Sequence, residues 1–374
     1  MVGFPVYNPR VAVAWGANLT GQLGDGTTTS RAYYGPVSGL GSFVVQVAAG
    51  GTFALALRSD GTVWAWGSNA SGQLGDGNTN YSTTPVQVGG LTNVVAVAAG
   101  ISQSLALRSD GTVWAWGGNQ YGELGIGTTS TDQLTPVQVR GLTGVTKISA
   151  GGLFSLALRS DGTVWAWGDN AQGELGNGTT ANSDVPVRVP GLSQVTRIDA
   201  GYYCSLAVST GIGGATPVWT WGGNDAGDLG DGTLTDRHTP EQVTGIGAPA
   251  VTGLAIGNGY ALALGSDGSV WAWGADTWGQ LGNAPQSAAV TCPILTIAPG
   301  SGITQLASGV DHVLALRANG TVLAWGRDYY GELGDGNSAP AVGPVQVAGL
   351  SGASQVSAGW EFSLALYTPP RVAL

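Results

Sequence analysis

Hydrophobic and polar positions repeat along this chain with a period close to fifty residues. Within the period at 94–142, an apolar run of small residues, "VVAVAAG", is followed by "SLALRSDG" and "TVWAWG", in which large and small apolar residues alternate. A glycine-rich polar loop comes next, and the short segment "TPVQV" ends the period. Alternation with a period of two is typical of β-strands. Each period therefore predicts four short strands joined by turns.

A Trp-Gly pair marks every period, and the ten residues "RSDGTVWAWG" occur identically at 58–67, 108–117 and 159–168. The tryptophans of the pairs lie 50 to 54 residues apart: Trp15, Trp66, Trp116, Trp167, Trp221, Trp273 and Trp325. Seven units of four antiparallel strands are the pattern of a propeller. We therefore expect an all-β fold, a seven-bladed β-propeller of four-stranded antiparallel blades.

The two ends of the chain each carry part of a period. The segment "VAVAWG" at 11–16 has the pattern of a third strand, and "QVSAGWEFSLALY" at 355–367 has that of a first and a second strand. We expect a single propeller domain over 1–374, with one blade shared between about 11–40 and 353–367. Pairing the two ends in this way would leave no open sheet edge in the ring.

Alternation in "TVWAWG" suggests why the segment recurs. Its two tryptophans point to one side of the strand and its valine and alanine to the other. Stacked blades need a bulky face against a small one, and each buried tryptophan contributes about 2–3 kcal/mol. The preceding Asp110-Gly111 pair favours a two-residue type I′ turn, which needs positive φ at both central positions. The same turn is expected at 60–61, 161–162, 267–268 and 319–320.

The direction of the strands divides the loops between two faces. The loops after the first and third strand of each unit share one face, which we name the loop face. The Asp-Gly turns and the connections between units share the opposite one, the turn face, which is nearly constant in sequence. Binding residues concentrate on loops held by a rigid scaffold. We therefore look for function on the variable loop face.

Aromatic residues gather at variable positions of the loop face, mainly in the last three units and the shared blade. Trp360, Trp278 and Tyr329 are the expected main anchors, because tryptophan and tyrosine dominate binding hot spots. The alternative is that these rings pack on neighbouring loops and cover glycine-rich backbone. Tyr33 and Tyr34 are placed on a further long loop of the shared blade. The expected partner-binding residues are Tyr202, Tyr203, Trp278, Tyr329, Tyr330, Trp360, Glu361, Asp311 and Tyr121.

Composition limits the kinds of partner. The chain has a formal net charge of −10, one lysine (Lys147) and no cluster of arginines. Nucleic-acid binding needs a basic surface, so we expect no nucleic-acid partner. An acidic protein is repelled by anionic membranes, and no apolar run approaches the ~20 residues of a membrane span. We expect a monomer whose partner is another protein.

Candidate chemistry is sparse, and we expect no enzyme, cofactor or metal. The "LGDGT" loops lack the spacing of a Ca²⁺ loop and predict tight turns. Asp311 beside His312 is the only pair weighed for catalysis, and a lone histidine is usually structural. Cys204 and Cys292 are expected to be unpaired thiols. The recurrent acids occupy a repeat position and are expected to make scaffold hydrogen bonds: Glu123, Glu174, Asp228 and Glu332.

The run "AAG…SLALRSDGTVWAWG.N..GQLGDGT…PVQV", almost intact at 98–139, resembles the repeats of the regulator of chromosome condensation family. The resemblance extends from about 11 to 367 and implies a seven-bladed propeller with a shared blade. The founding eukaryotic member is an exchange factor for a small GTPase and binds chromatin. The basic N-terminal tail and inserted β-hairpin of that protein have no counterpart in this sequence; the longest extra hairpin is 209–217. The repeat plan also resembles the propeller-type β-lactamase inhibitory proteins of soil bacteria, whose loop aromatics clamp another protein.

These observations favour a non-enzymatic scaffold that binds a protein through aromatic loops on one face. A carbohydrate-binding propeller is one alternative, because exposed aromatic rings also stack on sugars. Guanine nucleotide exchange on a small GTPase is another. The low lysine content and near-identical repeats are more typical of a bacterial protein than of a eukaryotic one. The sequence leaves the compartment open and slightly favours a secreted or cell-surface bacterial protein over a cytoplasmic one.

Overall fold

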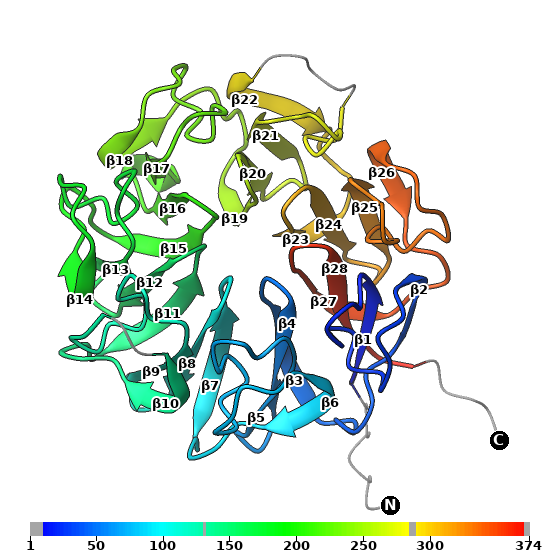
Figure 1. Ribbon diagram of the computed structural model, residues 1–374. Coiled ribbons are helices and arrows are strands. Elements are labelled where there is room, and N and C mark those ends of the chain that lie inside the picture. Colours follow the sequence, from blue (N-terminus) through cyan, green and yellow to red (C-terminus); the bar gives the residue numbers. More distant parts are fainter. Residues whose placement is uncertain (1–9, 130–131, 284–288, 370–374) are drawn as a thin grey trace, which may run out of the picture.

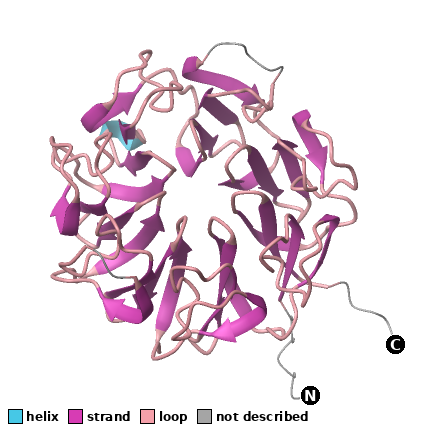
Figure 2. Ribbon diagram, in the orientation of Figure 1, coloured by secondary structure: helices cyan, strands magenta, loops and turns pink. Residues whose placement is uncertain are grey.

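Seven four-stranded antiparallel sheets follow one another around a central axis in this computed structural model (Figure 1). The structure describes residues 10–129, 132–283 and 289–369. Strands dominate the described residues, and a 3₁₀ turn at Ile212–Gly214 lies in the long hairpin that follows β16 (Figure 2). The expected all-β, seven-bladed propeller is confirmed. Among the described residues, no helix is long and apolar enough to cross a membrane.

Six blades are built from consecutive strands, which run in chain order from the channel outward. The first three are β3 (Val44–Ala49), β4 (Phe53–Arg58), β5 (Val63–Gly67) and β6 (Ser82–Gln87); β7 (Val94–Ala99), β8 (Gln103–Arg108), β9 (Val113–Gly117) and β10 (Gln133–Gln138); and β11 (Val145–Ala150), β12 (Phe154–Arg159), β13 (Val164–Gly168) and β14 (Ser183–Arg188). The next three are β15 (Val195–Ala200), β16 (Cys204–Ser209), β17 (Val218–Gly222) and β18 (Arg237–Val243); β19 (Val251–Ile256), β20 (Tyr260–Gly265), β21 (Val270–Gly274) and β22 (Val290–Ile297); and β23 (Ile303–Ser308), β24 (His312–Arg317), β25 (Val322–Gly326) and β26 (Ala341–Gln346).

The seventh blade joins the two ends of the chain, as expected. Its strand order is β27 (Ala353–Ala358), β28 (Phe362–Tyr367), β1 (Val11–Gly16) and β2 (Arg31–Pro36). Strands β1 and β28 pair without a register shift from Val11 opposite Tyr367 to Gly16 opposite Phe362. The shared blade therefore closes the ring and removes the open edges that an unclosed sheet would expose.

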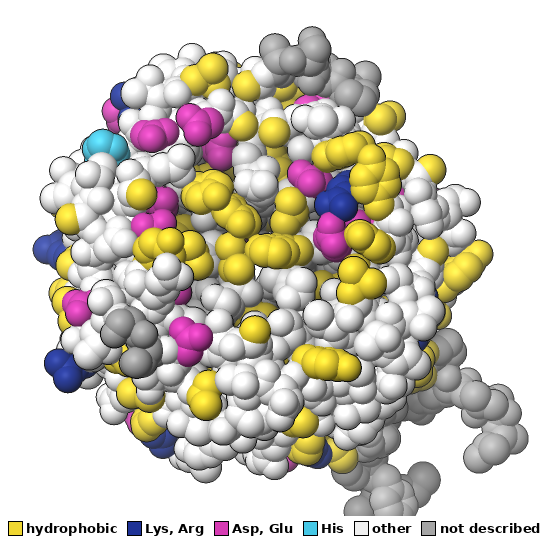
Figure 3. Space-filling model, in the orientation of Figure 1, with side chains coloured by type: hydrophobic (Ala, Val, Ile, Leu, Met, Phe, Trp, Pro, Cys, Tyr) yellow, Lys and Arg dark blue, Asp and Glu magenta, His cyan; other side chains and the backbone are white. Residues whose placement is uncertain are grey.

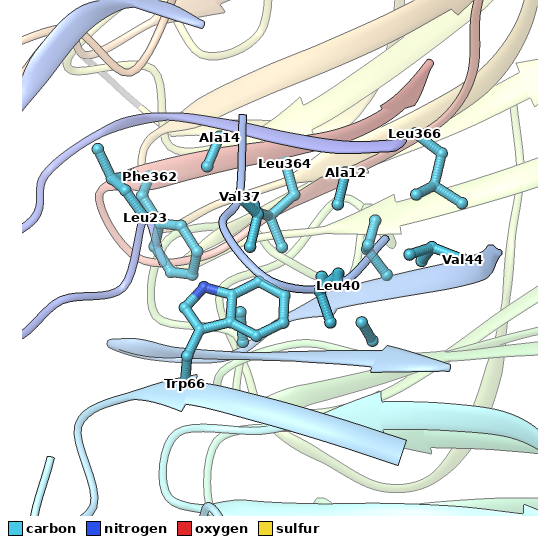
Figure 4. Close-up of a cluster of buried hydrophobic side chains, with 13 residues drawn as sticks. Ala12, Ala14, Leu23, Val37, Leu40, Val44, Trp66, Phe362, Leu364 and Leu366 are labelled. Carbon is cyan, nitrogen blue, oxygen red and sulfur yellow. The ribbon is translucent and has the colours of Figure 1, made fainter. Parts of the chain in front are cut away.

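Side chains of neighbouring blades interdigitate as the alternation in the sequence predicts. Trp66 of β5 is fully buried and packs against the shared blade, where it meets Ala14, Phe362 and Leu364 (Figure 4). Trp64, two residues earlier, lies on the same side and is half-buried. The bulky face of one blade thus fits the mixed large and small face of the blade before it, as close packing of side chains requires.

Each buried tryptophan also fastens its blade to the loop of the blade before it. Trp116 donates its indole N–H to the carbonyl oxygen of Gln73 at 2.9 Å. Gly75 lies so close to this indole that a Cβ would stand 2.7 Å from Nε1. The same indole bond is made by Trp15, Trp66, Trp167, Trp221, Trp273 and Trp325. This contact between blades explains why Trp-Gly and "LG" recur together.

The prediction of a two-residue type I′ turn at Asp110-Gly111 is wrong. Gly111 has a φ of +78°, but Asp110 is not among the described residues with positive φ. The loop holds three residues, Ser109 to Gly111, because the Arg108 N–H bonds the Thr112 carbonyl oxygen and the Gly111 N–H bonds the Arg108 carbonyl oxygen, each at 2.9 Å. This is a three-residue hairpin loop with glycine in the left-handed position. The Asp110 carboxylate accepts hydrogen bonds from the backbone N–H and the hydroxyl of Thr112, which favours this form.

The outer strands begin earlier than the sequence pattern indicates. Strand β10 starts at Gln133, two residues before the "TPVQV" segment, and its pairing with β9 shifts register between Gln133 and Val137. Pro136 lies inside the irregular stretch and has no N–H to donate to the ladder. The bulge hides the early part of the strand from a simple period of two.

Candidate functional site

Backbone hydrogen bonds confirm the division of loops between two faces. On the loop face, the Gly118 N–H after β9 bonds the carbonyl oxygen of Ser102 in the loop before β8 at 2.9 Å. On the turn face, the Ser109 N–H bonds the carbonyl oxygen of Asn93 in the connection between blades at 2.9 Å. Both sets of loops are therefore anchored to the sheets that carry them.

A central channel of about 510 Å³ runs between the inner strands. At its loop-face end, Tyr202 and Trp360 come from blades that are not neighbours, yet their rings stack with centroids 6.3 Å apart and planes 27° apart. Tyr203 packs edge-on against Tyr202 at 4.5 Å and keeps 41% of its surface exposed. We call Tyr202, Tyr203 and Trp360 the channel cluster. Hydrophobic side chains gather around the central hollow in this view (Figure 3).

Two further aromatic rings and an arginine lie beside the channel. We call these three residues the rim cluster: Trp278, Tyr329 and Arg327. The two rings meet edge to face at 5.2 Å. The Arg327 guanidinium lies 5.0 Å from the centroid of the Tyr329 ring, a cation–π contact. Tyr329 nevertheless keeps 51% of its surface exposed. The rim cluster therefore presents an aromatic surface whose orientation is fixed by its neighbours.

Two acids hold Arg327 in place and connect the clusters. The guanidinium forms a 2.7 Å ion pair with Glu361, the residue after Trp360, and lies 3.9 Å from Asp311. Burial raises the pKa of Asp311, the positive charge of Arg327 opposes this rise, and the charge of Glu361 adds to it. Because Glu361 belongs to the same loop as Trp360, the ion pair ties the rim cluster to the channel cluster.

Asp311 and His312 contact different groups. His312 is buried, and its Nε2 lies 3.0 Å from the hydroxyl of Ser363 on the shared blade. Burial lowers the pKa of His312 to about 3, so the imidazole is neutral at physiological pH. Asp311 lies beside Arg327 instead. The structural role expected of a lone histidine is confirmed.

The remaining aromatic residues singled out in the sequence are not members of the two clusters. Tyr330 is half-buried next to Tyr329, and its backbone N–H bonds the Glu332 carboxylate. Tyr121 is half-buried on the loop between β9 and β10, and within the described residues no ring contact links it to either cluster. Tyr33 and Tyr34 lie within strand β2, so their placement on a loop is wrong. Tyr34 packs edge-on against Tyr367 at 6.1 Å.

The recurrent acids have the expected scaffold role. The Glu174 carboxylate accepts a 2.9 Å hydrogen bond from the backbone N–H of Gln172, and burial raises its pKa to about 7. Burial likewise raises the pKa of Asp228 to about 6. In other blades Gln22, Gln73 and Gln280 make the same bond. These acids hold loops in shape.

The "LGDGT" loops are tight turns, as expected. The Asp25 carboxylate accepts hydrogen bonds from the backbone N–H and the hydroxyl of Thr27. Asn18 fastens the same loop through its amide. No group of three or more potential metal ligands occurs in the part of the chain that the structure describes. Cys204 is buried and Cys292 exposed, and both are free.

Sequence reasoning missed Arg327, which is central to the site. A signal for it exists in the repeat. The residue after Trp-Gly is small or acidic in every other unit: Ala17, Ser68, Gly118, Asp169, Gly223 and Ala275. A single arginine at a position that otherwise never carries a cation marks a departure from the scaffold pattern.

The propeller fold agrees with the comparison to known families. The chain belongs to the RCC1-like domain family, whose model matches residues 11–365. Among relatives, the ultraviolet-B receptor UVR8 of Arabidopsis thaliana is 31% identical over 329 residues, which are 86% of this chain and 74% of the receptor. The human E3 ubiquitin-protein ligase HERC2 is 34% identical over 276 residues, which are 72% of this chain but only 6% of the ligase.

Solved structures share the same architecture. Prp20p of Saccharomyces cerevisiae superimposes with a TM-score of 0.85 at 23% identity, covering 97% of this chain and 92% of that one. Human WBSCR16 also has a TM-score of 0.85, at 22% identity, covering 96% of this chain and all of the other. At these identities the likeness concerns the fold.

Proposed function

We propose that this protein is a non-enzymatic scaffold that binds another protein through the channel cluster and the rim cluster. The observation that carries the proposal is that Tyr203 and Tyr329 are both fixed in orientation and exposed to solvent. Each ring is held by a neighbouring ring, yet 41% and 51% of their surfaces are exposed. Aromatic anchors that are already ordered lose little entropy when a partner covers them. An exposed and oriented aromatic surface is what a binding hot spot requires.

The relatives support a protein partner. The structure of Prp20p is described with its binding to Gsp1p and histones, and yeast RCC1 has been solved bound to Kap60. Those partners belong to those proteins. For this chain we carry over only the coarser property, which is that an RCC1-like propeller serves as a docking surface for proteins.

The test compares two tryptophan variants with a control at the repeat position of Trp278. Trp278→Ala removes a rim ring, whereas Ser71→Ala changes the corresponding loop residue of another blade, whose backbone N–H bonds Gln73 as that of Trp278 bonds Gln280. After a partner is isolated with the full chain, affinity and melting temperature are measured for Trp278→Ala, Trp360→Ala and Ser71→Ala. We expect each tryptophan variant to weaken binding by about 2 kcal/mol or more, and Ser71→Ala to bind as the unmodified protein does.

A lower melting temperature with unchanged affinity would show that the rings only pack on neighbouring loops. The same variants tested on a glycan array, and in a nucleotide-release assay with a small GTPase, separate the two alternatives. Sugar binding lost in Trp360→Ala would favour a carbohydrate-binding propeller. Accelerated nucleotide release would favour exchange activity.

A further inference from the structure

The third positions of the seven inner strands form a ring, and all of its residues except Ala96 line the channel. These residues are Gln46, Ala96, Lys147, Arg197, Gly253, Gln305 and Gln355, and they lie on the strands that line the channel. The inner strands begin beside the Asp-Gly turns, as shown by the pairing of Val145 with Arg159. This ring therefore lies toward the turn face, away from the stacked rings of Tyr202 and Trp360.

Glutamine at this position fastens one blade to the next. The Gln46 amide donates to the Val97 carbonyl oxygen at 2.9 Å and accepts from the Val97 N–H at 3.0 Å. Gln305 makes the same pair of bonds to Val356, and Gln355 makes it to Val47. Glutamine thus has a defined structural role at this position in three blades.

Two neighbouring blades replace this glutamine with cations. Lys147 on β11 is the only lysine of the chain, and Arg197 lies on β15, the next inner strand. Neither side chain forms an ion pair or hydrogen bond with the described residues. Burial and the charge of Arg197 lower the pKa of Lys147, because two positive charges share one space. The glutamine bonds between blades are therefore absent at these two positions, although Ser149 still joins the same two blades through Asp199 and Ala200.

The surroundings leave room for a ligand beside the two cations. The flanking ring positions carry only small residues, Ala96 and Gly253. The nearest channel acid, Asp199, lies two residues beyond Arg197 toward the loop face, where its carboxylate is 3.2 Å from the hydroxyl of Ser149. Burial raises the pKa of Asp199 to about 7, so this carboxyl is partly neutral at physiological pH. Within the channel, Asp199 therefore offsets only part of the positive charge of the pair.

We propose that Lys147 and Arg197 form an anion site in the channel, entered from the turn face, for a ligand that carries at least two negative charges on phosphate groups. An arginine fork and a lysine ammonium group both bind phosphate oxygens. The channel volume of about 510 Å³ exceeds that of one phosphate and lies within the range of ligand pockets. The site is independent of the aromatic surface, since Tyr202 and Trp360 lie at the opposite end of the channel.

The test replaces both cations with the residue that three other blades use. Lys147→Gln with Arg197→Gln removes two charges, and glutamine at these positions can restore the bonds between blades. The control, Arg140→Gln with Arg188→Gln, removes two charges from exposed side chains outside the channel. Binding of inorganic phosphate, tripolyphosphate and a sugar phosphate to each full-length protein is measured by calorimetry at constant ionic strength, together with the melting temperature.

We expect tripolyphosphate to bind the unmodified protein and the control equally, and to bind the channel variant at least tenfold more weakly. Without ligand, the channel variant should melt at the same or a higher temperature, which shows that it is folded. The order of affinity among the three probes separates free phosphate from polyphosphate and phosphate esters. Equal binding by all three proteins, or no binding of any probe by the unmodified protein, would overturn the site.

Discussion

The loop position held by Glu174 shows how one side chain is exchanged for another without changing the fold. Gln22, Gln73 and Gln280 accept the backbone N–H two residues earlier, and Glu174 does the same with a carboxylate. An amide does this while neutral, whereas a buried carboxylate must lose its hydration. The acid and the amide thus serve one structural role at different electrostatic cost.

Glu174→Gln should therefore change how stability depends on pH. Burial raises the folded-state pKa from 4.5 to about 7, so the folded state keeps a proton that the unfolded chain releases. Stability from this group is complete below about pH 4.5 and is lost as pH rises toward 7. At 1.36 kcal/mol per pKa unit, the variant should gain up to roughly 3 kcal/mol over the unmodified protein at pH 8 and little at pH 4.5.

Urea unfolding at the two pH values measures the effect. The reverse change, Gln73→Glu, is the matched control, because it places a carboxyl at the corresponding position of another blade. It should introduce a loss of stability with rising pH. Parallel pH profiles for the unmodified protein and Glu174→Gln would show that the carboxyl of Glu174 is not the titrating group.

At the scale of one loop and one strand, the contact between tryptophan and glycine joins consecutive blades. Trp167 donates its indole N–H to the carbonyl oxygen of Glu123, and a Cβ on Gly125 would stand 2.8 Å from the indole ring. Gly125 has a φ of +66°. Two requirements meet at this glycine, a left-handed backbone and the absence of a side chain.

Gly125→Ala and Gly141→Ala separate the two requirements. Gly141 has a φ of +65°, almost the same as Gly125, but nothing lies within 4 Å of the site of its Cβ. Gly141→Ala should cost about 1 kcal/mol through backbone strain alone. Gly125→Ala should cost about 1–3 kcal/mol more, because the ring of Trp167 must move. Equal losses in thermal or denaturant unfolding would show that the contact between blades tolerates a methyl group.

The sequence predicts those features of the fold that recur in every unit better than those that depend on one local residue pair or on contacts between loops. Alternating residues and the spacing of Trp66 and its counterparts predict strands, blades and closure, because burial on two faces imposes that period. The Asp110-Gly111 pair predicts a two-residue turn, which is wrong because a bond to Thr112 selects the longer loop. The position of Arg327 depends on its ion pairs with Asp311 and Glu361, which lie on other loops, and no period within one unit encodes those contacts.

At the scale of the whole molecule, the ring depends on one pairing between distant parts of the chain. Deleting residues 353–374 removes β27 and β28 and leaves β1 without its inner neighbour. We expect the shortened protein to lose its single cooperative unfolding transition and to aggregate through bared strand edges. Calorimetry and light scattering measure both. A shortened protein that melts as the full chain does would refute closure by the shared blade.

A peptide that spans 353–367 provides the complementary control. Supplied to the shortened protein, it should pair with β1 and suppress aggregation, because it carries both missing strands. A peptide with the same composition in scrambled order should not, since register decides which side chains face the neighbouring blades.

Closure by distant strands also means that the shared blade cannot form until long after β1 has been synthesised. Strand β28 is translated roughly 350 residues after its partner β1, which at about 5–20 residues per second takes on the order of tens of seconds. During that interval the six intervening blades can form in order, while β1 and β2 lack the other two strands of their sheet. The nascent propeller thus keeps the edge of β1 unpaired until β28 has been made, and the final two strands of the ring complete the blade that its first two strands began.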